Sequence, residues 1–452
     1  MSSSTATPEK EEINRLLCEN FTKAIEGLDI YRPDKFFKDE MTVSKLRRRR
    51  LQGFEDVVGM VTLTEVDGVL RWEEGPGDSP LIRGRRRGRR GAVVGGEVVA
   101  QFKFEKLQPN DINTYLERLD DKLTPPRGLR RWMTQDPNDD VETALQPVAR
   151  PAAKGKILLI VHGTFSNCDN SWRELQATTE GRDLLGRMRA HYDEVLTFDH
   201  PTVAVSPTLN ALDLARLFKD SEADVDVISH SRGGLVTRWW LEAFDQPGRG
   251  RRRAVLVGSP LRGTSLASPP RLKAGLSLLT NVGRVLATTA DAGSSVIPFL
   301  AVASGLIRLL SSVTGAMGKV PLIDAAVAMI PGLAGQSLIS NNAELSRLNV
   351  DGSGKPPDYF AVRCNFQPKD PGWAFWKYFQ KGHLVNSAAD LLVFEGENDL
   401  VVDTSSMTGY STAGELPAEN VYTIPSTDRV HHTNYFRQPE VLSFIADKLQ
   451  IT

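Results

Sequence analysis

The sequence predicts an α/β protein with a mostly parallel central sheet, a helical insertion and a small N-terminal α+β domain. Short, mainly apolar runs alternate with helical patterns beyond residue 150, and the runs lie at 157–161, 195–198, 225–228, 254–257, 359–362 and 391–394. Runs this apolar suit strands that are buried on both faces. Between the second and third runs, Ala211, Leu214, Ala215 and Phe218 have the spacing of one helix face. Repeated strand, helix and strand segments imply a parallel sheet with helices on both sides.

The length predicts more than one folding unit. The chain has 452 residues, whereas a single hydrophobic core stops growing at about 250 to 300 residues. A connector rich in Pro and Asp ends near residue 150, so we expect an N-terminal α+β domain at 1–150 and the sheet domain at 151–452. Alternating segments at 58–72 and 98–104 indicate a small β unit in the first domain.

Composition and charge exclude several classes of protein. Hydrophobic residues make up 40% and charged residues 25% of the chain, which excludes a wholly disordered or fibrous protein. The net charge of −1 gives no overall field that would attract nucleic acid, so we expect none as a partner. Six arginines between Arg83 and Arg90 alternate with glycine. This run suits a solvated loop, and contact with a phosphate-rich partner is the alternative.

The cysteines and the first residues indicate a cytoplasmic protein. Cys18, Cys168 and Cys364 are far apart and form no C-x-x-C pair, which argues against a disulfide framework and a cysteine metal site. The opening MSSSTATPEKEEINRLL lacks the apolar core of a secretory signal. No apolar run reaches the length of a membrane-spanning helix.

A serine follows one of the predicted strands at a sharp turn. The run 225–228 leads into HSRGG at 230–234 and then into LVTRWWLEAF, which has a helical pattern. A nucleophile elbow needs this context, because a tight turn lifts the hydroxyl clear of the sheet and small neighbours let the helix approach. The pattern is S-x-S-x-G, with Ser229 where glycine is usual. Ser231 is therefore the candidate nucleophile.

A second loop supplies candidate oxyanion donors. The segment His162-Gly163-Thr164 follows the apolar run 157–161. Backbone N–H groups in a glycine-containing loop can meet the negative charge of a tetrahedral intermediate without rearranging. We expect the donors to be the amides of Thr164 and Arg232, the latter being the residue after the nucleophile, and we expect His162 to pack the loop.

The base and the orienting acid are expected near the end of the chain, in the order Ser, acid, His. Asp399 lies in a loop after an apolar run and is the first choice for the acid, with Asp403 and Glu397 as alternatives. His431 and His432 are adjacent. His432 is the first choice for the base, and His431 would point the opposite way in an extended segment.

Five segments carry a resemblance to a known family: VHGTF, ISHSRGG, VGSPLRGT, SLISNNAELSRLN and ENDLVVDTSS. In order and spacing they are similar to segments of bacterial lipases and related lipid deacylases. Over residues 154–450 the chain thus resembles lipases and esterases of the α/β-hydrolase superfamily. The resemblance implies that fold, with Ser231 as nucleophile, Asp399 as acid, His432 as base, and Thr164 and Arg232 as oxyanion donors.

An insertion of about 266–350 is expected to form a helical cap. From 272 to 338 it is rich in Leu, Val, Ala and Ile, and Gly and Pro divide it into several helices. It is either a buried helical subdomain or a mobile lid with an apolar face for acyl chains. An open lid would favour peripheral contact with a membrane.

These observations predict a serine hydrolase that cleaves a carboxylic ester with an apolar acyl group through an acyl-enzyme. No metal or organic cofactor is implied. A thioesterase, peptidase or acyltransferase would use the same groups. The alternative from another class is a catalytically silent scaffold that presents the N-terminal domain to a protein partner.

Overall fold

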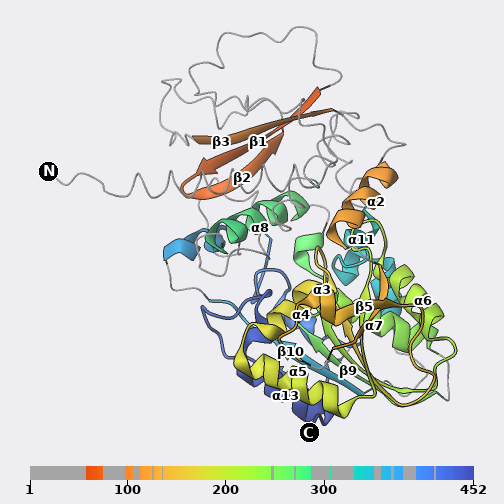
Figure 1. Ribbon diagram of the computed structural model, residues 1–452. Coiled ribbons are helices and arrows are strands. Elements are labelled where there is room, and N and C mark those ends of the chain that lie inside the picture. Colours follow the sequence, from red (N-terminus) through yellow and green to blue (C-terminus); the bar gives the residue numbers. More distant parts are fainter. Residues whose placement is uncertain are drawn as a thin grey trace, which may run out of the picture. The chain divides into compact units, whose positions relative to one another are not determined.

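The computed structural model describes two compact units of the chain (Figure 1). The smaller unit comprises Met1–Leu119, Pro269–Val327 and Asp370–Val393, and the larger unit comprises Asp120–Ser268, Ala328–Lys369 and Phe394–Thr452. The described residues are 58–74, 97–105, 112–124, 127–134, 136–245, 249–268, 271–286, 306, 330–350, 358–367, 371–379, 393–411 and 414–452. The arginine run at 83–90 lies outside them.

The larger unit contains the mostly parallel sheet that the apolar runs predict. Its strand order is β11-β10-β9-β8-β6-β7-β4-β5. β4 is antiparallel to both of its neighbours, and all other pairs are parallel. The strands are β4 (Gly128–Trp132), β5 (Leu145–Val148), β6 (Lys156–Val161), β7 (Glu194–Asp199), β8 (Asp224–His230), β9 (Arg252–Val257), β10 (Asp358–Arg363) and β11 (Val421–Thr423). The predicted fold class is confirmed.

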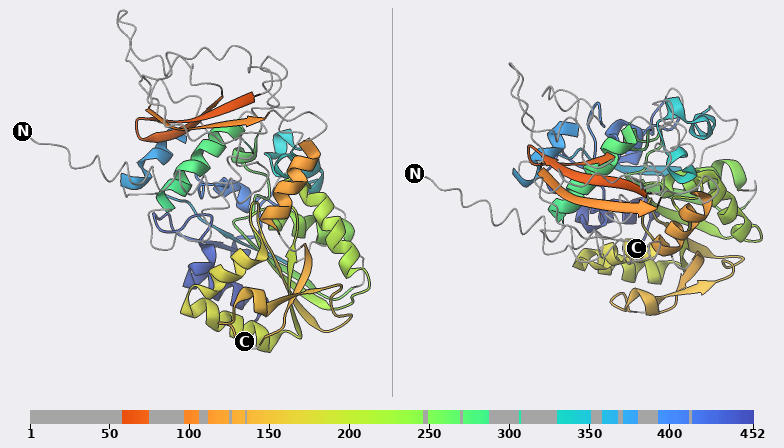
Figure 2. Two further views of the ribbon diagram at one scale, coloured as in Figure 1. Left: turned by 45° about the horizontal axis from the view of Figure 1, so that its top comes forward. Right: turned by 90° about the horizontal axis from the view of Figure 1, so that it is seen from above.

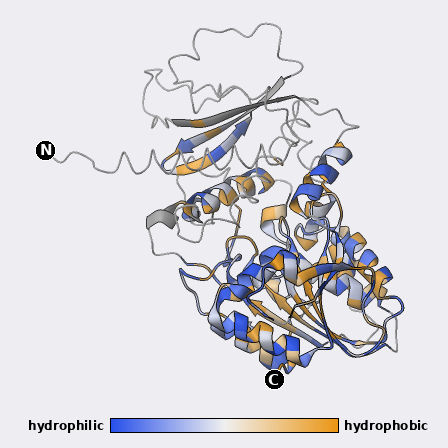
Figure 3. Ribbon diagram, viewed as in Figure 1, coloured by the Kyte–Doolittle hydropathy of each residue, from blue (hydrophilic) through white to orange (hydrophobic). Residues whose placement is uncertain are grey.

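Helices cover both faces of this sheet. α4 (Cys168–Gln176), α5 (Thr179–His191) and α13 (Pro439–Leu449) supply one buried apolar cluster. α6 (Pro207–Phe218) and α7 (Gly233–Trp239) supply the other. Figure 2 shows these two layers from a second direction, and in Figure 3 the strands between them are mainly hydrophobic.

Strand β6 shows why the apolar runs are continuous. Leu158 and Ile160 belong to the cluster on one face, whereas Ile157, Leu159 and Val161 belong to the cluster on the other. Successive side chains of a strand point to opposite faces. Because both faces are covered, every position from Ile157 to Val161 is apolar, and only the first residue, Lys156, is exposed.

The boundary expected at residue 150 is wrong, because the sheet begins earlier. β4 and β5 lie before that residue and form one edge of the sheet. β4 has the sequence GLRRW and does not look like a buried strand. Its arginines are neutralised by β7: Arg130 forms an ion pair with Asp199 (2.8 Å), and Arg131 forms one with Glu194. The larger unit starts at Asp120.

Of the apolar run 391–394, the structure describes only Val393 and Phe394, and neither lies in one of the named strands. Val393 donates its backbone N–H to the carbonyl of Phe379 (3.0 Å) and, like Phe394, is not part of a strand. Residues 391 and 392 lie outside the described part of the chain. The outer strand next to β10 is β11.

The smaller unit contains an antiparallel sheet of order β2-β1-β3. β1 (Val58–Val66) and β2 (Val69–Glu74) are joined by Asp67 and Gly68, which have φ values of 53° and 80°. Asp-Gly is a favoured pair for this tight hairpin turn. The alternating segments at 58–72 and 98–104 therefore lie in strands, the second in β3 (Glu97–Glu105).

Helix α8 (Leu272–Leu286) binds the outer strand of this small sheet. Asn281 accepts a hydrogen bond from the backbone N–H of Leu70 (2.9 Å) and donates one to its carbonyl (2.8 Å). The indole of Trp72 donates to the hydroxyl of Thr280 (2.8 Å). The helix thus satisfies polar groups that an edge strand would otherwise leave open.

The insertion expected as one cap at 266–350 is divided between the two units. Its helix α8 belongs to the smaller unit, together with the N-terminal sheet. Its last part, with α11 (Pro331–Ala334) and α12 (Ala343–Leu348), belongs to the larger unit. From 287 to 329, only Leu306 is among the described residues.

Candidate active site

Ser231 lies on a strained turn between β8 and α7. Its φ is +54°, a left-handed conformation that a residue with a side chain adopts at a cost of about 1 to 3 kcal/mol. The turn is fixed by a hydrogen bond from the Ser231 N–H to the carbonyl of Val257 (2.9 Å). A Cβ at Gly233 would lie 2.5 Å from the carbonyl oxygen of Val161, and one at Gly234 would lie 2.3 Å from the Ser259 hydroxyl. The two glycines let α7 begin directly against the loops that follow β6 and β9.

The structure brings Ser231, His432 and Asp399 into one hydrogen-bonded row. The Nε2 of His432 lies 2.8 Å from the Ser231 Oγ, and its Nδ1 lies 2.7 Å from the Asp399 Oδ2. These side chains come from residues that lie far apart in the sequence, and all three are buried. A hydroxyl, an imidazole and a carboxylate in this order have the geometry that activates a serine nucleophile.

Asp399 is held as a carboxylate by several donors. Its Oδ1 accepts backbone N–H groups of Val401 (3.1 Å) and Val402 (2.8 Å), and its Oδ2 accepts the Tyr435 hydroxyl (2.9 Å) as well as His432. Burial alone would raise the pKa of Asp399, but the charge of His432 and these hydrogen bonds outweigh it and lower the pKa below the usual value. The group is therefore ionised at neutral pH.

The alternative acids make other contacts. The carboxylate of Asp403 accepts hydrogen bonds from the backbone N–H (2.9 Å) and hydroxyl (3.1 Å) of Ser265. Glu397 is exposed. Neither is hydrogen-bonded to His432 in the described part of the chain, so the geometry favours Asp399.

His431 is not part of the hydrogen-bonded row of Ser231, His432 and Asp399. Its Nδ1 lies 3.1 Å from the hydroxyl of Thr433, and its ring packs edge-on against Phe366. Burial lowers the pKa of His431 to about 4, so it is neutral near pH 7. The ring of His431 thus makes other contacts than that of His432, which lies between Ser231 and Asp399.

The loop after β6 lies directly against the nucleophile. A Cβ at Gly163 would be only 2.8 Å from the Cβ of Ser231 and 3.2 Å from the carbonyl of His230. The next residue, Thr164, donates its hydroxyl to the Oε1 of Gln336 (2.9 Å). No described residue accepts a hydrogen bond from the backbone N–H of Thr164 or of Arg232. Both amides are thus available to an oxyanion.

The side chain of Arg232 makes other contacts and is not a candidate oxyanion donor. Its guanidinium is buried and donates to the carbonyl of Val205 (2.5 Å). Burial lowers the pKa of Arg232 to about 10, against the opposing effect of Asp120 and Glu344. Only the backbone of this residue serves as a candidate oxyanion donor.

His162, Cys168 and Asp199 lie close enough together to resemble a metal site. His162 is already satisfied, because its Nδ1 donates to the carbonyl of Gly163 (2.9 Å) and its Nε2 accepts the N–H of His200 (3.1 Å). The carboxylate of Asp199 is paired with Arg130. Burial lowers the pKa of His162 to about 3 and raises that of the Cys168 thiol well above its usual value. The cluster is a structural network beneath the Gly163 loop.

Backbone strain marks residues that the sequence did not single out for it. Phe165 follows the candidate donor Thr164 and has a φ of +56°, and Leu400 follows Asp399 with a φ of +80°. Positive φ at residues with large side chains persists where the surroundings enforce it, and it is frequent in active sites. No sequence signal for positive φ exists at a Phe or a Leu, so these two turns were missed.

The sheet, the elbow between β8 and α7, and the row of side chains at the end of the strands together form an α/β-hydrolase fold. A family model described as "Domain of unknown function (DUF7379)" matches residues 126–450, which is more than half of the chain. The chain belongs to this family. The match begins just before β4, in agreement with the boundary that the sheet defines.

Several solved structures are similar to this chain at low sequence identity. The mature lipase BlEst2 of Bacillus licheniformis is 16% identical, with 68% of this chain and 96% of that chain covered and a TM-score of 0.32. Lipase 1 from Pelosinus fermentans is 14% identical, with 67% and 99% covered and a TM-score of 0.37. Phospholipase PlaB from Legionella pneumophila, in complex with thio-NAD, is 12% identical, with 66% and 62% covered and a TM-score of 0.36. No curated protein matches the chain. Its chemistry is therefore inferred from its own residues.

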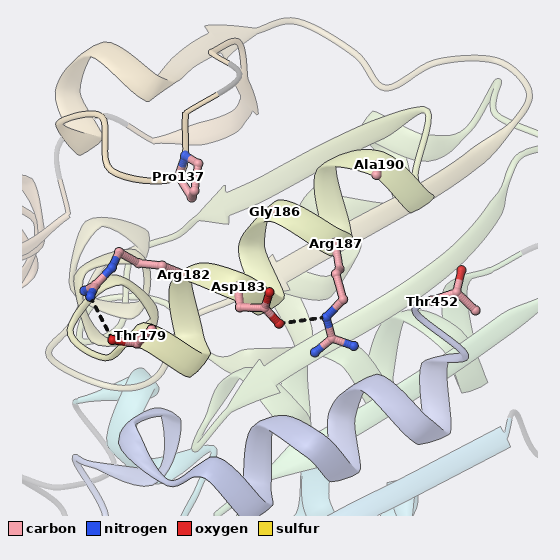
Figure 4. Close-up of a pocket in the computed structure, with 8 residues that line it drawn as sticks. All are labelled: Pro137, Thr179, Arg182, Asp183, Gly186, Arg187, Ala190 and Thr452. Atoms are coloured by element: carbon pink, nitrogen blue, oxygen red, sulfur yellow. Dashed lines mark hydrogen bonds and ion pairs between the residues drawn. The ribbon is translucent and has the colours of Figure 1, made fainter.

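A surface hollow on α5 is separate from this site (Figure 4). Its volume is about 480 Å³, and its lining includes Arg182, Asp183 and Arg187 but none of the candidate catalytic residues. Arg187 is paired with Asp183 (3.1 Å). Among the described helices, none has both the length and the apolar character that crossing a bilayer requires.

Replacing Gly163 with alanine is expected to lower kcat/KM for an ester by about a hundredfold, the effect of losing one oxyanion donor. The new methyl group would overlap Ser231 and force the loop, with the Thr164 amide, away from the nucleophile. Gly186→Ala is the matched control, because a Cβ there meets nothing within 4 Å. Steady-state kinetics and melting temperatures of both variants test this expectation, and full activity in Gly163→Ala would contradict the assigned place of the loop.

Proposed function

We propose that this chain is a serine hydrolase that cleaves a carboxylic ester with an apolar acyl group. The proposal rests on one observation above all: the Ser231 hydroxyl lies within hydrogen-bond distance of an imidazole that a buried carboxylate orients. The strained turn at Ser231 and the free amides of Thr164 and Arg232 support it. A scaffold has no need of these features together.

In the first half of the proposed reaction, His432 Nε2 takes the proton of the Ser231 hydroxyl as its oxygen attacks the acyl carbon. The negative charge that develops on the carbonyl oxygen is met by the N–H groups of Thr164 and Arg232. The protonated His432 then gives its proton to the leaving alcohol, and the acyl group stays on Ser231.

In the second half, a water molecule attacks the acyl-enzyme. His432 takes one proton of that water and returns it to the Ser231 oxygen as the acid product leaves. Asp399 keeps the Nδ1 of the imidazole protonated throughout, so that Nε2 is the atom that exchanges protons. The same groups would also cleave a thioester. Assays with both kinds of substrate therefore decide whether the leaving group is an alcohol or a thiol.

The preference for an apolar acyl group rests on the composition of the insertion, which is rich in Leu, Val, Ala and Ile between residues 272 and 338. Contact with a lipid surface through this insertion, a protein partner for the N-terminal segment and a cytoplasmic location stay predictions.

Activity is expected to rise with acyl chain length from acetyl to octanoyl p-nitrophenyl esters. Each added methylene that leaves water contributes up to about 0.8 kcal/mol, or roughly fourfold in kcat/KM. Assays below the critical micelle concentration separate this effect from binding to aggregates. A steady fall from acetyl onward would contradict the apolar acyl preference, and parallel thioester substrates would show which leaving group is favoured.

A further inference from the structure

A tyrosine hydroxyl shares the carboxylate oxygen that orients the candidate base. Tyr435 lies shortly after His432, at the start of the short helix Tyr435–Arg437. Its hydroxyl is 2.9 Å from the Oδ2 of Asp399, the same atom that lies 2.7 Å from the His432 Nδ1. The side chain of Tyr435 is almost completely buried.

The phenolic hydrogen has a choice of acceptors, and the carboxylate is the strongest. The hydroxyl oxygen also lies 3.1 Å from the Sγ of Cys364 and 3.7 Å from the Sδ of Met407. Sulfur is a weak acceptor, whereas hydrogen bonds to ionised oxygen are roughly twice as strong as neutral ones. Burial raises the pKa of Tyr435 well above its usual value, so the phenol keeps its hydrogen. That hydrogen points to Asp399.

The place of the ring is defined by a glycine on the neighbouring strand end. A Cβ at Gly258 would lie 2.7 Å from the Cε2 of Tyr435 and 3.4 Å from the Oδ2 of Asp399. The φ of Gly258 is +56°, which disfavours other residues at this position. The absence of a side chain at Gly258 leaves room for the phenol beside the carboxylate of Asp399.

We propose that Tyr435 is a positioning residue that holds the carboxylate of Asp399 for His432. It completes a set of four donors, in which Val401 and Val402 bind Oδ1 while His432 and Tyr435 bind Oδ2. The carboxylate then cannot rotate away from the imidazole. Because the phenol also withdraws charge from Oδ2, it weakens the attraction of the carboxylate for a proton on the imidazole.

The other titratable groups around this pair keep one charge state near neutral pH. Burial lowers the pKa of His230 to about 3 and that of His431 to about 4. Burial also raises the pKa of the Cys364 thiol, and Arg437 beside His431 stays charged. A change in the acid limb of the pH profile therefore reports on the row formed by Asp399 and His432.

The test rests on the proposed ester hydrolysis and uses Tyr435→Phe in the full chain. We expect kcat for a chromogenic ester to fall about tenfold, the loss of one hydrogen bond to a charged group, with KM changed by less than about twofold, because the phenol does not contact substrate. The acid limb of the kcat/KM profile should move to higher pH by about half a unit to one unit. An acid limb at the wild-type pH would overturn the proposal, because it would show that the Tyr435 hydroxyl does not influence the proton affinity of His432.

Two controls match this variant. Cys364→Ala removes the competing acceptor and leaves the phenol in place, so its acid limb should stay at the wild-type pH. Tyr422→Phe removes a hydroxyl on β11, where the ring stacks on Phe444 (centroids 5.6 Å apart), and should leave the whole profile unchanged. A shift in Cys364→Ala as large as that in Tyr435→Phe would contradict the assigned direction of the hydrogen bond.

A second measurement needs no substrate. In protein labelled with nitrogen-15 histidine, the pH midpoint of the His432 signal, assigned by its loss in His432→Ala, should rise in Tyr435→Phe by the same amount as the acid limb. If the folded wild-type protein hydrolyses no ester or thioester, the proposed function fails, and this measurement still decides the role of Tyr435. An unchanged midpoint would overturn that role even in an active enzyme.

Discussion

Replacing Ser231 with alanine is expected to lower kcat for ester hydrolysis by about a millionfold, to the rate supported by binding and the oxyanion donors alone. Without the hydroxyl, His432 has no nucleophile to deprotonate, and a water molecule in its place lacks the fixed position that the turn gives to Oγ. The measurement is a steady-state assay with a chromogenic ester at high enzyme concentration, and a residual rate within about a hundredfold of wild type would contradict the assignment.

Two further serine variants separate loss of chemistry from loss of structure. Ser229→Ala changes a buried serine of β8, the strand that leads into the turn, and should keep most of the activity because the side chain of Ser229 has no hydrogen-bond partner among the described residues. Ser231→Gly should be as inactive as Ser231→Ala, yet more stable by about 1 kcal/mol, because glycine adopts the φ of +54° without strain. Denaturant unfolding of the two inactive variants measures this difference.

Replacing His432 with alanine is expected to lower kcat by a comparable factor, about a hundred thousand to a million. The imidazole transfers the proton in both halves of the reaction, and no other described base lies within hydrogen-bond distance of the Ser231 Oγ. His431→Ala is the matched control, because its ring contacts Phe366 and Thr433 rather than the serine.

The two histidine variants should differ in kind as well as in size. His431→Ala removes a partly buried, neutral ring and is expected to lower the free energy of unfolding by about 1 to 3 kcal/mol while kcat stays within about tenfold of wild type. The comparison is made by kinetics and by unfolding of the same preparations. If His431→Ala abolished turnover and His432→Ala did not, the base would be His431 and the assignment of His432 would be contradicted.

The central strands and the turn at Ser231 could be predicted because the residues that determine them are neighbours in the sequence. β6 is a continuous apolar run from Ile157 to Val161 because helices cover both faces of the sheet. The elbow at Ser231 could be predicted because a helix that starts close to neighbouring strand ends needs small residues in its first turn, and Gly233 and Gly234 follow the serine. The order of Ser231, Asp399 and His432 along the chain then limited the choice of acid and base.

Strand β4 could not be predicted in this way. Arg130 is buried within it only because Asp199 of β7 neutralises its charge. That compensation comes from a residue far along the chain, and nothing in GLRRW indicates it. The expected domain boundary at residue 150 failed for the same reason.

The division of the insertion is a second feature that local patterns did not indicate. An apolar helix such as α8 is typical of a cap, and its sequence does not show which surface will cover it. Its polar residues Thr280 and Asn281 bind β2, which belongs to the N-terminal segment. Side chains that satisfy a distant strand edge carry no periodic signal.

The supporting residues of the site were missed because their function depends on contacts in three dimensions. Gly163 was predicted as part of the oxyanion loop, but its close approach to the nucleophile, with an ideal Cβ 2.8 Å from the Cβ of Ser231, could not be predicted. Tyr435 looks like a core aromatic residue, and its hydroxyl becomes informative only beside Asp399. Only the position of Tyr435, shortly after the candidate base His432, indicated in the sequence that it could lie near the site.

The most direct test of the central claim is covalent labelling of the full chain with a fluorophosphonate, followed by peptide mass spectrometry. The probe reacts with a serine oxygen only where a base activates it and oxyanion donors receive the developing charge. We expect wild-type protein to carry the label on the peptide that contains Ser231, with no label in Ser231→Ala and much slower labelling in His432→Ala. A folded wild-type protein that stays unlabelled, or that carries the label at another residue, would contradict the proposed catalytic row.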